Sequence, residues 1–256
     1  MAESDYTPLN NHAVDHFLAA KTNRFELTFF ETALLTMTPI PLMFGEDYDW
    51  QAESFSNENL DFALGRHDYA RLGRPLFVLT HILSPHPPFT IDRDGRPRRD
   101  EAGINDGDHW IRGDTVRRRR YRDGYLEKLR YTNRSLLKHV EGLIEDVAGP
   151  KVIIMHGDHG GGLGLSHDDA SATCLKERFS PLLAVYASDR GLANAFGEDT
   201  NLVNVYRVLF NELFDTELPL LPARSFFASW EDPTEIREID PDLLQTLAPA
   251  SCTAPM

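Results

Sequence analysis

Three short runs of apolar residues each begin at or just after a proline. They cover residues 76–79, 152–155 and 181–186. Continuous apolar runs of this length are typical of strands buried on both faces of a sheet, the usual state of strands in parallel sheets. We therefore predict three buried strands, and we expect residues 225–230 to add an edge strand.

Elsewhere the apolar residues recur every three or four positions, which is the spacing of one face of an α-helix. This spacing predicts helices over residues 13–35, 57–72 and 202–213 and a longer one from Val116 or Tyr121 to Val147. The long helix is expected to cover the sheet with an apolar face made of Leu126, Leu129, Leu136, Leu137, Val140, Leu143, Ile144 and Val147. Strands that alternate with helices predict an α/β layered domain with a largely parallel sheet.

Proline, glycine and polar residues predict where the regular elements stop. The prolines within residues 80–89 exclude a helix there and hold the segment extended. Residues 90–114 are rich in Gly, Asp and Arg, which indicates a loop with a turn at residues 92–95. The last residues, 240–256, are predicted to form a disordered tail behind a single domain, residues 1–239.

Composition adds limits on size and partners. The chain has 256 residues, 41% of them hydrophobic and 26% charged, which suffices for a sizeable core in one domain. The net charge of −14 argues against a general nucleic-acid binder. Only Cys174 and Cys252 are present, so we expect neither a disulfide framework nor a cysteine zinc site, and the cellular compartment is left open.

Signals for a membrane or for secretion are not expected from the sequence. The most apolar early stretch, residues 27–44, contains Glu31, Pro39 and Pro41 and falls short of the roughly 20 uninterrupted apolar residues that a span needs. Residues 1–11 are polar and lack the pattern of a secretory signal. The sequence thus predicts a soluble protein.

The strongest candidate chemistry follows the run at residues 152–155. His156, Asp158 and His159 stand there, followed by glycines that permit close approach of a ligand. Ligands of open α/β sheets bind at the carboxyl ends of the strands. A carboxylate beside an imidazole is a donor pair that a divalent metal accepts, so Asp158 and His159 are candidate ligands. The alternative is an ordinary Asp-His turn.

The order of several motifs resembles a known family. The segments are, in order, THILSPHPPF, YLEKLRYTNRSLLKHVEGLI, VIIMHGDHGGGLG, LKERFSPLLAVY and NLVNVYRVLFNELF. Together they resemble the C-terminal half of sulfatase-like proteins of the alkaline phosphatase superfamily, over roughly residues 24–230. The likeness is greatest to the bacterial membrane-anchored branch, which includes lipoteichoic-acid-synthase-like and phosphoethanolamine-transferase-like enzymes. It implies a three-layer α/β/α sandwich of the alkaline-phosphatase type, truncated at its N-terminus.

The resemblance also implies roles for individual residues. Asp158 and His159 match metal ligands of the family. His86, and more weakly His81, match a histidine that contacts the substrate or donates a proton; a loop histidine bonded to a backbone carbonyl is the alternative. Three further residues are candidates for binding the anionic substrate, namely His167, Lys176 and Arg178.

The implied cofactor is one divalent metal ion. An imidazole beside a carboxylate favours Zn²⁺ or Mn²⁺, while Mg²⁺ and Ca²⁺ are further possibilities. The implied substrate is an anionic phosphate or sulfate ester, and the sequence does not distinguish the two. The implied place of a full-length form is the bacterial inner membrane, with this domain periplasmic or extracellular.

The family's nucleophile and first metal carboxylate are expected before this stretch, and residues 1–25 do not have their strand-loop-helix pattern. Two functional readings follow. The first is a metal-dependent hydrolase or transferase that needs a separate N-terminal or membrane-anchoring part, for example as a fragment of a longer phosphoglycerol or phosphoethanolamine transferase. The second is a noncatalytic binding or scaffold domain.

Overall fold

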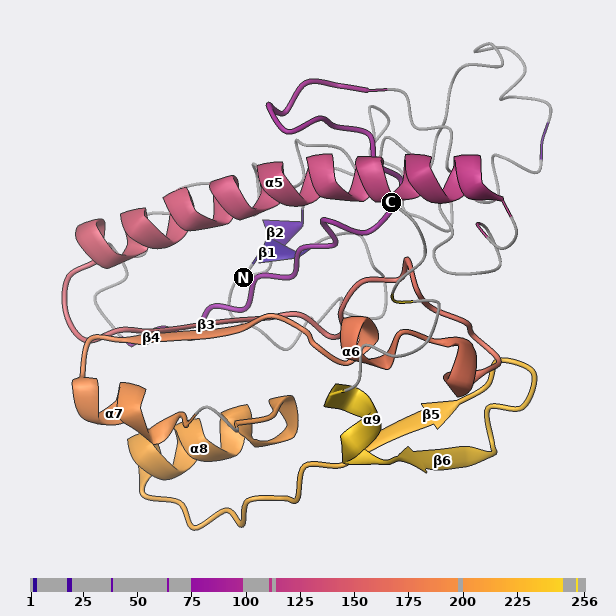
Figure 1. Ribbon diagram of the computed structural model, residues 1–256. Coiled ribbons are helices and arrows are strands. Elements are labelled where there is room, and N and C mark those ends of the chain that lie inside the picture. Colours follow the sequence, from indigo (N-terminus) through magenta and orange to yellow (C-terminus); the bar gives the residue numbers. More distant parts are fainter. Residues whose placement is uncertain are drawn as a thin grey trace. The chain divides into compact units, whose positions relative to one another are not determined.

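The computed structural model describes residues 75–98, 114–197 and 200–245, together with the isolated positions 2–3, 18–19, 38, 64, 111 and 252 (Figure 1). The chain divides into two compact units. The first comprises Met1–Asp106 and Gly113–Val147, and the second comprises Gly107–Arg112 and Ala148–Met256. The predicted helices at residues 13–35 and 57–72 lie outside the described residues.

The first unit is dominated by helix α5 (Thr115–Asp146), which confirms the predicted long helix (Figure 1). Asp114 is its N-cap, and the Asp114 side chain accepts hydrogen bonds from the backbone N–H groups of Val116 and Arg117 at 2.9 Å each. These two bonds, led by the one from Arg117, hold the pKa of Asp114 below its usual value. No helix in the part of the chain that the structure describes is both long enough and apolar enough to cross a membrane.

The buried stripe of α5 differs from the predicted apolar face. Its members are Tyr121, Gly124, Lys128 and Thr132, whereas Leu126 and Leu137 are exposed. The stripe packs on the proline segment of residues 84–89: the Phe89 ring lies edge-on to Tyr121 with centroids 5.0 Å apart. Helical spacing predicts a helix whichever face is covered, and the covered face depends on which segment the helix meets.

Polar contacts complete this packing. Lys128 is 2% exposed, and its ammonium donates to the carbonyl oxygens of His86 at 2.7 Å and Pro88 at 3.0 Å. The hydroxyls of Ser84 and Thr132 hydrogen-bond at 2.5 Å. The proline segment is therefore held to α5 by a buried cation as well as by the Phe89 ring.

The turn predicted at residues 92–95 is confirmed. The Gly95 N–H donates to the Asp92 carbonyl at 3.0 Å, and Gly95 has φ +81°, a conformation that glycine adopts without strain. The Arg93 guanidinium on this turn forms an ion pair with Glu127 of α5. Its Nε donates to the carboxylate oxygens Oε1 at 3.0 Å and Oε2 at 2.9 Å. This pairing lowers the pKa of Glu127 to about 2.

The predicted strand at residues 76–79 is wrong. These residues are in no strand, and all four side chains are exposed, with Phe77 at 75%. An apolar run becomes a strand only where its backbone N–H and C=O groups find a neighbouring strand.

Short parallel strands β1 (Ala2–Glu3) and β2 (Leu18–Ala19) also belong to the first unit.

The described residues of the second unit form two antiparallel sheets of two strands each. Strand β3 (Val152–His156) pairs antiparallel with β4 (Leu183–Ala187), with Ile154 opposite Val185 (Figure 1). Strand β5 (Ser225–Ala228) pairs antiparallel with β6 (Ile236–Ile239). These pairs confirm strands in three of the predicted places.

The predicted fold class, a three-layer α/β/α sandwich with a largely parallel sheet, is wrong for the described part of the chain. That part has two small antiparallel sheets, one parallel pair of two-residue strands (β1 and β2) and the helices α5 to α9 instead. Continuous apolar runs indicated burial on both faces, but the side chains of β3 and β4 are only half-buried or exposed. Composition does not determine whether two strands run parallel or antiparallel. Their relative direction depends on the path of the chain that connects them.

The second unit also contains one 3₁₀ helix and four α-helices among its described residues. They are η4 (Ala170–Ala172), α6 (Leu175–Arg178), α7 (Arg190–Ala195), α8 (Leu202–Phe214) and α9 (Pro241–Gln245). Helix α8 confirms the predicted final amphipathic helix, and its buried face is Asn204, Val205, Val208 and Leu209. Helix α9 lies in the stretch for which the sequence predicts a disordered tail.

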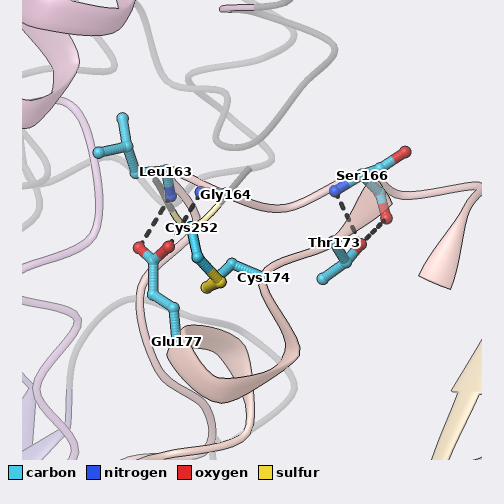
Figure 2. The surroundings of a disulfide bond; sticks show 7 residues. All are labelled: Leu163, Gly164, Ser166, Thr173, Cys174, Glu177 and Cys252. Carbon is cyan, nitrogen blue, oxygen red and sulfur yellow. Dashed lines mark hydrogen bonds between the residues drawn. A yellow bond between two sulfur atoms is a disulfide. The ribbon is translucent and has the colours of Figure 1, made fainter. Parts of the chain in front are cut away.

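A disulfide joins Cys174 to Cys252 across 78 residues of sequence (Figure 2). The bond is a single cross-link and not a framework, so it does not contradict the expectation drawn from the cysteine count, and the pairing itself was not predicted from the sequence. A single pair of cysteines forms no framework, yet it can cross-link two distant segments wherever the fold brings the sulfur atoms together.

Candidate metal and anion site

The candidate site begins where β3 ends. His156, the last residue of β3, is exposed, and its Nε2 lies 3.2 Å from the hydroxyl of Tyr206 on α8. The next residue, Gly157, donates its N–H to the Leu182 carbonyl at 3.0 Å, which holds the start of the loop beside β4. The chain then turns outward into Asp158 and His159.

Asp158 and His159 lie side by side. The Asp158 Oδ1 accepts the His159 backbone N–H at 3.0 Å, and Asp158 Oδ2 lies 3.4 Å from His159 Nε2. The Asp158 side chain is 87% exposed and that of His159 is 39% exposed. The predicted pair of candidate ligands is thus adjacent and open to solvent.

The tautomer of His159 follows from its other nitrogen. Nδ1 lies 2.9 Å from the carbonyl oxygen of Gly160, and a carbonyl only accepts, so Nδ1 carries the proton. In the neutral ring Nε2 then presents a lone pair toward the Asp158 carboxylate. Two acceptors so close repel each other, and either a proton on Nε2 or a cation between the two atoms removes the repulsion.

The spacing of these two atoms fits a metal ion. Two ligands at about 2.1 Å from a tetrahedral zinc ion lie roughly 3.4 Å apart, which is the separation of Asp158 Oδ2 and His159 Nε2. Among residues that the structure describes, no group of three or more His, Cys, Asp or Glu side chains is gathered as a metal centre would need. The described donors are therefore two, and any further ligand would be water, substrate or a residue outside the described ranges.

Arg178 on α6 joins the same loop. The Nη1 atom of its guanidinium donates to the Gly160 carbonyl at 3.3 Å, and its backbone carbonyl accepts the Gly160 N–H at 2.7 Å. The Gly160 carbonyl is thus shared by His159 and Arg178, which places a cation next to the Asp-His pair. Lys176, also on α6, is exposed.

His167 takes a different position from the one that substrate binding suggests. It is 5% exposed, and its ring packs against that of Trp230 with centroids 3.9 Å apart. The Trp230 N–H also donates to the His167 carbonyl at 3.2 Å. These contacts give His167 a packing role, and its predicted contact with substrate stays a prediction.

His81 and His86 belong to the first unit, whereas Asp158 and His159 belong to the second. His86 is exposed, and its Nδ1 lies 2.6 Å from the Pro87 carbonyl. This is the geometry of a loop histidine bonded to a backbone carbonyl.

Sequence reasoning missed Glu177. Its carboxylate accepts the backbone N–H groups of Leu163 at 3.2 Å and Gly164 at 3.0 Å, so it holds the glycine loop that follows His159 (Figure 2). In the sequence Glu177 stands between Lys176 and Arg178, a pattern typical of a solvated cluster of charged residues. No spacing rule connects it to a loop 13 or 14 positions earlier.

Comparison with models of protein families, with curated proteins and with solved structures found no match. The likeness of residues 24–230 to sulfatase-like proteins remains a prediction from motif order. A function for this protein is therefore inferred from the chemistry of the loop itself.

Proposed function

We propose that this protein binds a divalent cation, Zn²⁺ or Mn²⁺ in preference to Mg²⁺ or Ca²⁺, at Asp158 and His159 and acts on phosphate or sulfate esters as a hydrolase or transferase. The observation that carries the proposal is the pair of acceptor atoms 3.4 Å apart, with the Arg178 guanidinium bonded to the carbonyl that also orients His159. A carboxylate, an imidazole and a guanidinium together suit a cation and an anionic oxygen.

The residues of the chain have distinct roles in this proposal. The Gly160 carbonyl holds Nδ1 of His159, which leaves Nε2 beside the Asp158 carboxylate as the proposed ligand atom. Arg178, which is half-buried, supplies positive charge for an anionic ester. When bound, a divalent ion would polarise an ester oxygen and lower the pKa of a coordinated nucleophile. His86 and His81 are proposed proton donors on the resemblance alone.

The noncatalytic reading is the second candidate. Among the described residues, Asp158 and His159 supply two donor atoms, whereas catalytic zinc sites commonly have three protein ligands. A domain with such a partial site could still bind an anionic ester through a loosely held ion without turning it over.

The disulfide bears on the proposed location. Disulfides persist in oxidising compartments, so the Cys174–Cys252 bond supports a periplasmic or extracellular domain. A full-length form anchored in the bacterial inner membrane remains part of the proposal.

Turnover and metal binding separate the two candidates. The protein would be assayed with p-nitrophenyl phosphate and p-nitrophenyl sulfate in the presence of Mn²⁺, Zn²⁺, Mg²⁺ or Ca²⁺, and metal binding would be measured by calorimetry. Metal-dependent turnover that Asp158→Ala removes and Glu145→Ala retains supports the enzyme; Glu145 is an exposed residue on α5. Binding without turnover refutes the claim that this chain alone is an enzyme and supports the noncatalytic candidate for it, and no binding of any metal refutes both.

A further inference from the structure

The glycine loop that follows His159 is wrapped around the four-residue helix α6. Besides the two bonds to the Glu177 carboxylate, Gly160 and Gly161 lie directly against Glu177. A Cβ added at Gly160 would collide with the Glu177 carbonyl oxygen, and one added at Gly161 would lie 2.5 Å from Glu177 Oε1. The loop can approach α6 this closely only because these positions lack side chains.

Helix α6 is itself tied to the chain on both sides. The Cys174 N–H donates to the Gly164 carbonyl at 2.6 Å, and the Arg178 carbonyl accepts the Gly160 N–H at 2.7 Å. Cys174 is 4% exposed and carries the disulfide to Cys252, as Figure 2 shows. A helix of four residues has too few internal bonds to be stable alone, so these external ties hold its position.

A second pair of bonds closes the loop behind the disulfide. The Thr173 hydroxyl donates to the Ser166 carbonyl at 2.9 Å and accepts the Ser166 N–H at 3.0 Å (Figure 2). Both residues are buried. The chain between Gly160 and Cys174 therefore returns on itself. Backbone groups of Gly160, Leu163 and Gly164 bond to α6 or to its N-cap Cys174, and those of Ser166 bond to the Thr173 hydroxyl.

We propose that Glu177 is a positioning residue for the Asp158–His159 pair, and that the Cys174–Cys252 disulfide makes its hold dependent on oxidation. Glu177 touches neither candidate ligand in this arrangement. It acts through the backbone of the loop, because the carbonyl that orients His159 belongs to Gly160, the residue packed on Glu177. Reduction by a dithiol, which supplies two electrons and two protons and is itself oxidised to a disulfide, converts the bond to two thiols, removes the covalent tie between α6 and Cys252 and loosens the loop. The effect on metal affinity rests on the proposed function, whereas the effect on the loop does not.

The first test follows the loop directly and needs no metal. Hydrogen exchange at the amides of Leu163 and Gly164 would be measured by NMR in the whole protein, with Glu177→Gln and Glu212→Gln compared. Glutamine keeps the shape but replaces one accepting oxygen by a donor, so one of the two amides loses its partner and exchanges at least about 10-fold faster. Glu212 is an exposed glutamate on α8, and its variant should exchange like the unaltered protein. Equal protection in Glu177→Gln and Glu212→Gln overturns the clamp.

The second test asks whether the clamp positions the ligands or only adds stability. Mn²⁺ binding would be measured by calorimetry at a temperature where all variants are folded. Glu177→Gln should weaken binding about 10-fold, as is typical when a residue behind a metal ligand is changed. Leu192→Ala, which removes a buried side chain from α7, should lower stability and leave affinity unchanged. An equal loss of affinity in both variants reduces Glu177 to a structural role and overturns the proposal.

The third test concerns oxidation. Treatment with a reducing agent should raise the exchange of the Leu163 and Gly164 amides, and reoxidation should restore their protection. Unchanged exchange in the reduced protein, with the free thiols verified by mass spectrometry, refutes the redox dependence. If the unaltered protein binds no Mn²⁺, the proposed function fails, and the exchange measurements still decide whether the clamp exists.

Discussion

At the residue scale, the orientation of one imidazole determines what the Asp-His motif can do. Here the Gly160 carbonyl takes Nδ1 of His159, which leaves Nε2 for the carboxylate side. The proposed metal site therefore depends on the bonding of a backbone carbonyl that the motif itself does not specify.

Asp158→Ala should abolish metal binding with little loss of stability. The carboxylate is 87% exposed, so its removal should change the free energy of unfolding by less than about 0.5 kcal/mol, while metal affinity falls more than about 100-fold. Calorimetry and urea denaturation measure the two effects. His86→Ala is the matched control and should keep the metal. Unchanged affinity in Asp158→Ala contradicts the assignment, and loss of metal in His86→Ala would move His86 into the ligand shell.

Gly160→Ala should be destabilising because the new Cβ meets the backbone of Glu177, which cannot turn aside as a side chain can. Overpacking of this kind costs about 1–3 kcal/mol. The comparison is Gly197→Ala, since a Cβ there meets nothing within 4 Å and the change should be neutral or slightly stabilising. Urea denaturation of both variants checks the prediction, which fails if the two midpoints agree.

At the element scale, α5 owes its fixed place in the first unit to residues that periodicity did not select. The predicted leucines do not form its buried stripe, and Lys128 and Thr132 do. A buried ammonium is favourable here because the turning proline segment offers two carbonyls to it. The element was predictable from sequence, and its packed face was set by its partner.

The contact between α5 and the turn at residues 92–95 should depend on pH. The hydrogen bond from Arg93, the largest cause, lowers the pKa of Glu127 from its usual 4.5 to about 2. A carboxylate whose folded pKa is lowered contributes stability above about pH 4.5, and this contribution is lost as the pH falls toward 2. Urea midpoints for the unaltered protein and for Glu127→Gln should differ at neutral pH and converge on acidification. Midpoints that stay parallel down to about pH 2 would contradict this.

At the scale of the whole molecule, the disulfide links the loop region to the C-terminal segment. Cys252→Ser removes a cross-link that closes 78 residues, and the loss should be about 2–4 kcal/mol in the free energy of unfolding. Reduced unaltered protein is the control, because it should unfold at the same urea concentration as the variant. A variant as stable as the oxidised protein would show that the bond contributes nothing.

Local pattern predicted local structure well. The helix over residues 115–146, the amphipathic helix α8, the turn at residues 92–95 and strands at β3, β4 and β5 all follow from apolar spacing and turn residues. Each depends on bonds between residues near in sequence or on a run of one residue type. The adjacency of Asp158 and His159 is likewise a property of neighbours in the chain.

Pairing and packing were decided only in three dimensions. The sequence determined an acidic chain with an Asp-His-Gly loop after an apolar strand, because charge and periodicity are sums over local residues. The tertiary structure decided that β3 and β4 run antiparallel, that Lys128 is buried, and that Glu177 and the disulfide hold the loop. Each of these features depends on contacts between residues far apart in the chain. Local residue preferences cannot predict such contacts, because the stabilising free energy depends on a partner that the local sequence does not identify.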